Sequence, residues 1–86
     1  MTDWPKYESH KIVQAAKIVA IAEHDGVLSI MVRPYGDDRL ERFVPTEDAM
    51  ILRAEVGGYA VIYPPDGYKS VSPAKAFEDG YTLIKG

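Results

Sequence analysis

The sequence predicts a small α+β domain that is rich in β-strands, with antiparallel hairpins or a meander of about five to six strands and two short helices. Three observations support this fold class. Apolar and polar residues alternate in several short runs, and turn signals that contain Gly or Pro separate these runs. Two further segments carry the start and stop signals of helices. The chain has 86 residues, which is enough for one modest core, so we expect a single domain over residues 1–86.

The first half of the chain is expected to form a three-stranded meander. Residues 12–23 fit the spacing of an amphipathic helix and fit a buried strand equally well, so periodicity leaves both open. The turn signal His24-Asp25-Gly26 follows this segment, and the alternation in residues 27–33 then favours a hairpin. After a loop at residues 34–38, we expect a short, charged and exposed strand over residues 39–44.

A short helix is expected at residues 47–55. Thr46 can accept a backbone hydrogen bond at its start, and the acidic residues Glu47 and Asp48 suit the positive end of the helix dipole. Gly57 can adopt the left-handed conformation that follows a helix. These signals predict the first of the two helices.

The last third of the chain predicts a hairpin, a helix and a closing strand. Residues 59–63 and 68–71 are expected to pair across the turn Pro64-Pro65-Asp66-Gly67. Ser72-Pro73 is a strong helix start, in which the hydroxyl caps the helix and the proline ring fixes φ, and Gly80 ends the helix. Residues 81–84 should then form an edge strand.

The composition excludes several classes of protein. Ten Lys and Arg residues against 13 Asp and Glu give a net charge of −3, which argues against general nucleic-acid binding. The absence of cysteine excludes a disulfide framework and a thiolate metal site. The longest apolar run, residues 18–22, is far shorter than the ~20 residues of a membrane span. We therefore expect no membrane association and a cytoplasmic location.

The residues that could support catalysis are few. The chain has two histidines, and His24 lies in a predicted turn where an exposed polar residue is ordinary. The adjacent carboxylates have structural explanations: Asp37-Asp38 in a loop, Glu47-Asp48 at a helix start and Glu78-Asp79 in the last turn of a helix. The sequence therefore predicts no catalytic residue, no metal site, no cofactor and no enzyme.

Aromatic and basic residues point to binding. The chain has six tyrosines, and a phenol ring offers an apolar stacking face with a hydrogen-bonding tip. Stacking rings and cations together suit a nucleobase and its phosphate. The candidate ligand contacts are Tyr7, His10, Lys11, Tyr68 and Lys69. We assign Tyr59 and Tyr63 to the core of the sheet instead.

A second, basic cluster is formed by Arg33, Arg39 and Arg42, which flank the loop around Tyr35. Clustered arginines can bind an anionic ligand. Solvated strand ends explain the same residues equally well, so both interpretations stay open.

Both ends of the chain resemble one group of proteins. Residues 57–82, GGYAVIYPPDGYKSVSPAKAFEDGYT, and residues 6–18, KYESHKIVQAAKI, are similar to the ends of small uncharacterised bacteriophage and prophage proteins. The resemblance covers about half of the chain. The insertion of Pro64-Pro65 before Asp66 departs from the tighter turn of that group.

What this resemblance implies is an accessory protein that is made in an infected bacterium and acts by binding. The leading hypothesis is a counter-defence factor that binds a host protein or sequesters a small nucleotide-derived immune signal. We also expect a homo-oligomer, because a domain with so little core gains by burying a further face and the strand at 81–84 could pair across a two-fold axis. The alternatives are a small virion or assembly protein and, last, a hydrolase.

Overall fold

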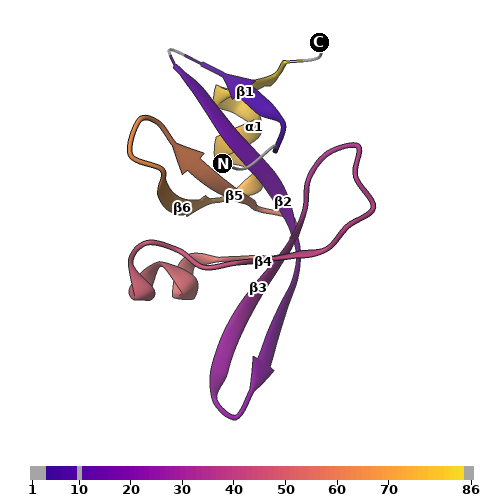
Figure 1. Ribbon diagram of the computed structural model, residues 1–86, viewed down its shortest axis with the longest axis vertical. Helices are drawn as coiled ribbons and strands as arrows, with labels where there is room; N and C mark the ends of the chain where they lie inside the picture. Colours follow the sequence, from indigo (N-terminus) through magenta and orange to yellow (C-terminus); the bar gives the residue numbers. More distant parts are fainter. Residues whose placement is uncertain (1–3, 10, 85–86) are drawn as a thin grey trace.

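The computed structural model describes residues 4–9 and 11–84 and confirms the α+β class. Over these residues one antiparallel sheet of seven strands is accompanied by a 3₁₀ helix, η1, and an α-helix, α1 (Figure 1). In chain order the elements are β1 (Lys6–Glu8), β2 (Ile12–His24), β3 (Val27–Arg33), β4 (Glu41–Phe43), η1 (Asp48–Arg53), β5 (Tyr59–Tyr63), β6 (Tyr68–Ser72), α1 (Ala74–Gly80) and β7 (Thr82–Leu83).

Strand β2 organises the sheet because it is 13 residues long and has neighbours on both edges. One edge pairs first with β1 and then with β3, while the other edge pairs with β5 over the middle of the strand. β3 continues to β4, β1 continues to β7, and β5 continues to β6. Residues 12–23 are therefore strand, and the predicted meander and the predicted hairpin at 59–71 are confirmed.

A β-bulge in β2 keeps the apolar residues of this long strand on the core face of the sheet. The pairing of β2 with β3 shifts between Ile18 and Ala20, which leaves Val19 as the extra residue. Side chains alternate faces along a strand, so without the extra residue Ile18 and Ile21 would face opposite sides. With it, Ile21 packs against the same cluster that contains Ile18.

Both faces of the sheet bury apolar side chains. On one face η1 and the β3–β4 hairpin cover a cluster that consists of Trp4, Ala16, Ile18, Ile30, Val32, Phe43 and Ala60. On the other face α1 covers a second cluster that consists of Tyr7, Val13, Ala15, Tyr59, Val61 and Phe77. Because β2 contributes to both clusters, its central residues alternate between them, as a strand with a period of two requires.

The short helix expected at residues 47–55 is present as a 3₁₀ helix of six residues, which is shorter than expected. The hydroxyl of Thr46 does not cap it; this oxygen accepts the Lys69 N–H at 2.8 Å instead. The helix buries none of its residues, and only Ile51 and Ala54 in this region pack against a core cluster. With so little apolar contact to stabilise it, the segment forms the short, tight helix typical of connectors.

The second predicted helix is confirmed as α1, although its start differs in detail. Pro73 occupies the N-cap position, with ψ of 149°, and no side chain caps the helix. The Ser72 hydroxyl donates to the carbonyl of Pro73 at 3.4 Å, so the predicted hydroxyl cap is wrong. The helix ends as expected near Gly80. Its apolar contacts with the sheet are Phe77, of which 2% is exposed, and the partly buried Ala74.

Three strands differ from expectation at the margins. β1 was not predicted, because three residues are too few for a clear alternation. β4 covers only Glu41–Phe43 of the expected 39–44, and β7 covers only Thr82–Leu83 of the expected 81–84. β7 lies at the end of the strand order, as predicted for an edge strand.

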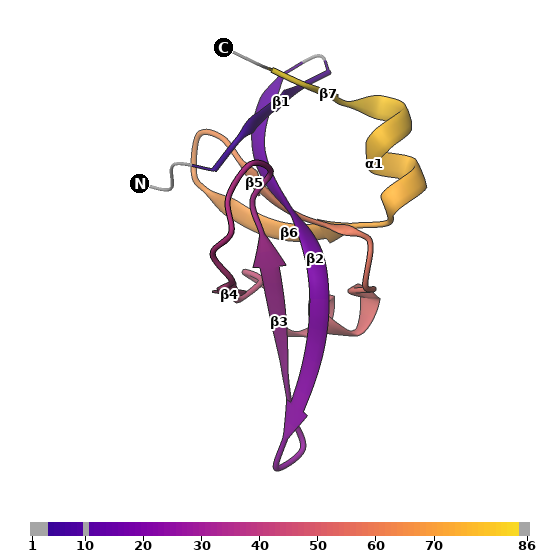
Figure 2. The same ribbon diagram turned by 90° about the vertical axis from the view of Figure 1, so that its right-hand side faces the viewer.

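The β2–β3 hairpin gives the molecule its elongated shape, with extents of 40 × 26 × 26 Å. Its distal half projects from the body in both side views (Figures 1 and 2). A two-residue turn joins the strands, with positive φ at Asp25 (53°) and Gly26 (78°). Such a turn matches the twist of a hairpin and accounts for the Asp-Gly signal in the sequence.

Candidate functional site

A groove of about 880 Å³ separates the two hairpins β1–β2 and β5–β6. Its volume lies within the range of small-molecule sites. One wall comes from β1, β2 and their connection, and the other comes from β5, β6 and their turn. The residues that line it are Lys6, Glu8, Lys11, Ile12, Val13, Gln14, Ile62, Tyr63, Pro64, Pro65, Asp66, Gly67 and Lys69.

The groove opens because the two hairpins stop pairing. The residue pairs between β2 and β5 end at Gln14–Ile62, although β2 extends to Ile12. On the β5 side the chain continues into Pro64 and Pro65, which have no backbone N–H to donate to a ladder. The two hairpins therefore diverge from this point. The same two prolines, joined by a cis peptide bond, then line the groove.

Three lysines dominate the electrostatics of the groove. Lys6, Lys11 and Lys69 line it together with two carboxylates, Glu8 and Asp66. The lining therefore carries a formal charge of +1, three positive charges against two negative, in a chain of net charge −3. Among residues 4–9 and 11–84, none of the three lysines forms an ion pair, which leaves their amines available to an anion.

Two of these lysines are held in place. The Lys11 amine lies 4.9 Å from the centre of the Tyr63 ring, so a cation–π contact links the two walls. The backbone of Lys69 is bonded twice to Thr46: its N–H donates to the Thr46 hydroxyl at 2.8 Å and its carbonyl accepts the Thr46 N–H at 3.0 Å. Burial raises the pKa of Tyr63 above its ordinary value, so the ring is neutral beside the lysine.

The structure brings part of the predicted site together. Lys11 and Lys69 both line the groove. Tyr68 does not line it, although its ring lies 6.5 Å from that of its cross-strand partner Tyr63. Tyr7 lies elsewhere, buried under α1 with its ring 5.0 Å from that of Phe77. His10 falls outside the described residues.

Sequence reasoning missed Lys6, Gln14 and Tyr63 as lining residues. Tyr63 belongs in part to the core, as predicted, because it packs against the cluster under α1. It also faces the groove, which the alternation pattern could not indicate. The signal that could have found it is the Pro-Pro pair that follows, because prolines end the pairing of a strand and leave its last side chain at an opening.

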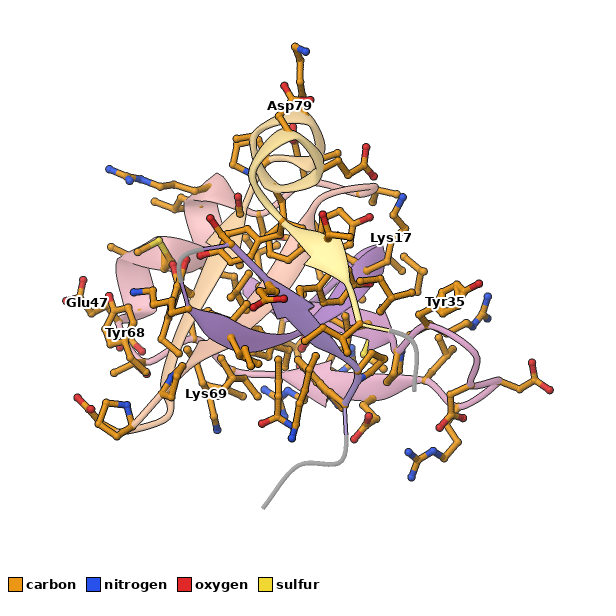
Figure 3. The ribbon with its side chains drawn as sticks, turned by 90° about the horizontal axis from the view of Figure 1, so that it is seen from above. Lys17, Tyr35, Glu47, Tyr68, Lys69 and Asp79 are labelled. Carbon is orange, nitrogen blue, oxygen red and sulfur yellow. The ribbon has the colours of Figure 1, made fainter. Side chains whose placement is uncertain are left out.

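A smaller cavity of about 310 Å³ lies away from the groove, and its lining is Tyr7, Lys17, Val19, Arg33, Pro34, Tyr35 and Tyr59. In the view from above, the labelled Lys17 and Tyr35 lie on the opposite side of the molecule from Tyr68 and Lys69 (Figure 3). Lys17 sits directly opposite Arg33 in the β2–β3 register and lies 3.6 Å from the Glu78 carboxylate. This carboxylate offsets the repulsion that two cations in such a pair produce.

A buried tyrosine completes this second cavity. The Tyr59 hydroxyl donates to the Glu78 carboxylate at 2.8 Å. Burial raises the pKa of Tyr59 well above its ordinary value, and the hydrogen bond to Glu78 adds to the rise. Burial also raises the pKa of Tyr7, with Tyr35 and Glu78 contributing. Both phenols are therefore protonated near neutral pH.

The predicted arginine cluster is divided. Arg39 is bound to Asp37 through two guanidinium contacts of 2.8 Å, which hold the pKa of that carboxyl below its usual range. Arg33 lines the smaller cavity, while Arg42 lines a separate pocket near η1. Arg33 and Arg42 do share a sheet face, because Arg42 pairs with Met31 and Met31 precedes Arg33 by two residues.

The potential catalytic groups are dispersed in the part of the chain that the structure describes. His24 is exposed at the tip of the β2–β3 hairpin, 3.3 Å from Asp25 and at the far end of β2 from the groove. No three His, Cys, Asp or Glu residues among those described lie close enough to hold a metal ion. The described residues also contain no helix with the length and apolar character of a membrane span.

Comparison with protein-family models, with curated proteins and with solved structures finds no match for this chain. The class of the molecule rests on its own fold and groove: it is a small α+β domain with a cationic cleft between two hairpins.

Proposed function

We propose that this protein is a small non-enzymatic binding module whose groove takes a nucleotide-like ligand, an aromatic ring that carries phosphate. The observation that carries the proposal is the Lys11–Tyr63 contact beside Lys6 and Lys69 in one groove. The unpaired amines suit phosphate oxygens. The apolar surface of Ile62 and the adjacent prolines suits the face of a ring.

The phage-type role is a second part of the proposal and rests on the resemblance of both ends of the chain. A protein of this kind would act in the cytoplasm of an infected bacterium, by sequestering a nucleotide-derived immune signal. The absence of cysteine fits a reducing compartment. The non-enzymatic character belongs to the same proposal, because the chain has only two histidines and no cysteine.

Ligand binding can be tested by thermal unfolding in the presence of ADP, ADP-ribose and a set of cyclic dinucleotides. A compound present at a hundred times its dissociation constant stabilises the protein by about 2.7 kcal/mol. We expect at least one phosphorylated compound to raise the melting temperature, whereas the corresponding nucleoside does not. If none of them shifts the transition, the proposed ligand class is wrong and a host protein becomes the target to test.

A matched pair of variants tests whether the ligand binds in the groove. Lys69→Met removes a groove amine and keeps most of the side chain's volume. It should lower the affinity for the bound compound about tenfold, as expected for the loss of one charge-assisted hydrogen bond. Lys75→Met is the control, because Lys75 is exposed on α1 and pairs with Asp79 at 3.0 Å. Equal affinity of the two variants would place the ligand outside the groove.

The counter-defence role needs a test in cells. The protein would be expressed in bacteria that carry a nucleotide-signalling immune system and are then infected. We expect plaque numbers to rise with the native chain and not with Lys69→Met. Rescue that is independent of Lys69 would contradict the link between the groove and the role.

A further inference from the structure

The outer edge of β2 is unpaired over its last five residues, Ala20–His24, in the part of the chain that the structure describes. Pairing with β5 on this edge ends at Lys17–Tyr59. Two backbone bonds follow, in which the Ile18 N–H donates to Gly58 and the Ile18 carbonyl accepts from Gly57, both at 2.8 Å. Beyond Ile18, β2 has a strand neighbour only on its other edge, where β3 lies.

The register fixes which backbone groups point outward. Ile21 shares the core face of Ile18, because the bulge at Val19 restores that face. Residues that share a face also direct their N–H and C=O groups to the same edge. The backbone groups of Ile21 and Glu23 therefore point away from β3. His24 and Val27 flank the two-residue turn and form a pair, so the backbone groups of His24 point toward β3. By alternation, those of Glu23 and Ile21 point the other way, which agrees with this assignment.

Over Ala20–His24 this edge has no lysine, no proline and no paired strand among the described residues, and its protection against pairing is limited to the bulge at Val19 and the charge of Glu23. Soluble proteins shield free edges with lysine, proline, coverage by a loop, or very short strands. Here the edge reads Ala20-Ile21-Ala22, and its two alanines have small side chains that let another backbone approach. Both views show this part of the hairpin standing clear of η1 and α1 (Figures 1 and 2). A projecting two-stranded ribbon is also only marginally stable without a third strand.

We propose that this edge binds the same edge of a second copy of the chain, antiparallel about a two-fold axis at Ala22. In that register Ile21 lies opposite the partner's Glu23, and Glu23 lies opposite the partner's Ile21. The outward N–H and C=O groups of these residues then form four hydrogen bonds. Ala22 faces the partner's Ala22 at the close, non-hydrogen-bonded spacing of antiparallel strands.

Charge and hydrogen bonding select this register over its neighbours. A two-fold axis at Glu23 would place two carboxylates directly opposite each other, which is destabilising. An axis at Ile21 would align Ile21 with the partner's Ile21 and form two bonds instead of four. The edge of β7, which the sequence suggested for pairing, offers only Thr82 and Leu83. The interface is small, so the dimer should be concentration-dependent.

Cysteine crosslinking gives a direct test, because the chain contains no cysteine. Facing residues at this spacing have Cα atoms about 4.5 Å apart, within the range of a disulfide. We expect oxidised Ala22→Cys to run as a covalent dimer on a non-reducing gel. Ser29→Cys is the matched control, because Ser29 pairs with Ala22 and lies on β3, the opposite edge of the ribbon, before the pairing of β3 with β4 begins at Ile30. Thr82→Cys tests the β7 edge.

A second pair of variants, each combined with Ala22→Cys, tests the backbone bonds. Glu23→Pro removes an N–H that points to solvent in the monomer, a change that edge strands tolerate. It should abolish the crosslinking that Ala22→Cys gives by itself, whereas Glu23→Gln should retain it, with circular dichroism confirming that both variants fold.

The assembly of the unaltered chain is the remaining readout. Sedimentation should show a dimer at millimolar concentration. A strict monomer there, or crosslinking through Ser29→Cys or Thr82→Cys in preference to Ala22→Cys, would overturn the proposal. Neither sedimentation nor crosslinking depends on the groove ligand.

Discussion

The amine of Lys11 and the ring of Tyr63 lie 4.9 Å apart and connect the two hairpins that form the walls of the groove. The two residues are far apart in the sequence and belong to different walls. Their contact orders a cation beside an apolar surface, which is the arrangement that an amphipathic anion needs. The groove therefore depends on how the two hairpins are placed relative to each other.

Replacing the ring should weaken ligand binding. Tyr63→Leu preserves apolar volume but removes the cation–π contact, so we expect the affinity for a groove ligand to fall about twofold to fivefold, since an exposed contact of this kind contributes about 0.5–1 kcal/mol. Titration calorimetry would measure the change. Tyr68→Leu is the control, because this ring lies 6.5 Å from that of Tyr63 and does not line the groove. A larger loss in Tyr68→Leu would contradict the assigned wall.

The protein should become less stable at alkaline pH. Burial raises the pKa values of Tyr7, Tyr59 and Tyr63 in the folded state. Above about pH 10 an unfolded tyrosine loses its proton while these folded tyrosines keep theirs. The free energy of unfolding therefore falls as pH rises through that range, by up to about 1.4 kcal/mol per pH unit for each tyrosine, and this contribution is fully present below about pH 10.

Urea unfolding at about pH 8 and at several values above about pH 10 would measure this dependence. Tyr59→Phe should show a shallower loss in the alkaline range, because it removes the phenol with the largest rise in pKa. Near neutral pH it should lose about 1 kcal/mol, as expected for its hydrogen bond to Glu78. Tyr35→Phe is a suitable control, since this ring is 60% exposed. An unchanged alkaline slope in Tyr59→Phe would contradict the prediction.

Substitution by alanine should have opposite effects on stability at two glycines. A Cβ at Gly58 would lie 2.8 Å from the backbone oxygen of Ser72, so Gly58→Ala forces the β5–β6 ladder to shift and should cost about 1–3 kcal/mol. A Cβ at Gly80 meets nothing within 4 Å, and Gly80 is the last residue of α1. Gly80→Ala should therefore leave the stability unchanged or raise it by up to about 1 kcal/mol. The midpoints of urea unfolding would show whether the two changes differ in this order.

The docking of α1 should depend on Phe77. This ring is 2% exposed, and it stacks on Tyr59 with ring centres 4.4 Å apart. Phe77→Ala should destabilise the protein by about 3–5 kcal/mol, a large part of the stability of so small a domain. Phe77→Leu keeps much of the volume and should lose less. The fluorescence of Trp4, which is buried in the other cluster, would follow unfolding in both variants. Equal losses would mean that the packing at this site is not tight.

Local signals in the sequence were sufficient for much of the fold. The Asp25-Gly26 turn and the alternation after it predicted the first hairpin, and the Pro64–Gly67 turn predicted the second. These features depend on residues close together in the chain, where side-chain period and turn chemistry act directly. The helix-start signal at Thr46 was only partly reliable: a short helix is present, but the capping role predicted for this residue was wrong, because its hydroxyl accepts the N–H of the distant Lys69 instead.

The candidate site was predictable only in part. Lys11 and Lys69 could be identified as available cations from their residue type and from the aromatic residues near them in the chain. That Tyr63 faces the groove while Tyr7 is buried under α1 follows from which strand pairs with which. A local pattern records that a side chain alternates between two faces, but not what covers either face.

The sequence by itself determined the α+β class, the two hairpins and the supply of cations and rings, because propensity, turn residues and composition are local properties. The tertiary structure decided that β5 joins β2, that two clusters form on opposite faces and that a free edge remains beyond Ile18. These outcomes depend on burying apolar surface between segments distant in the chain, so no short stretch of sequence contains them.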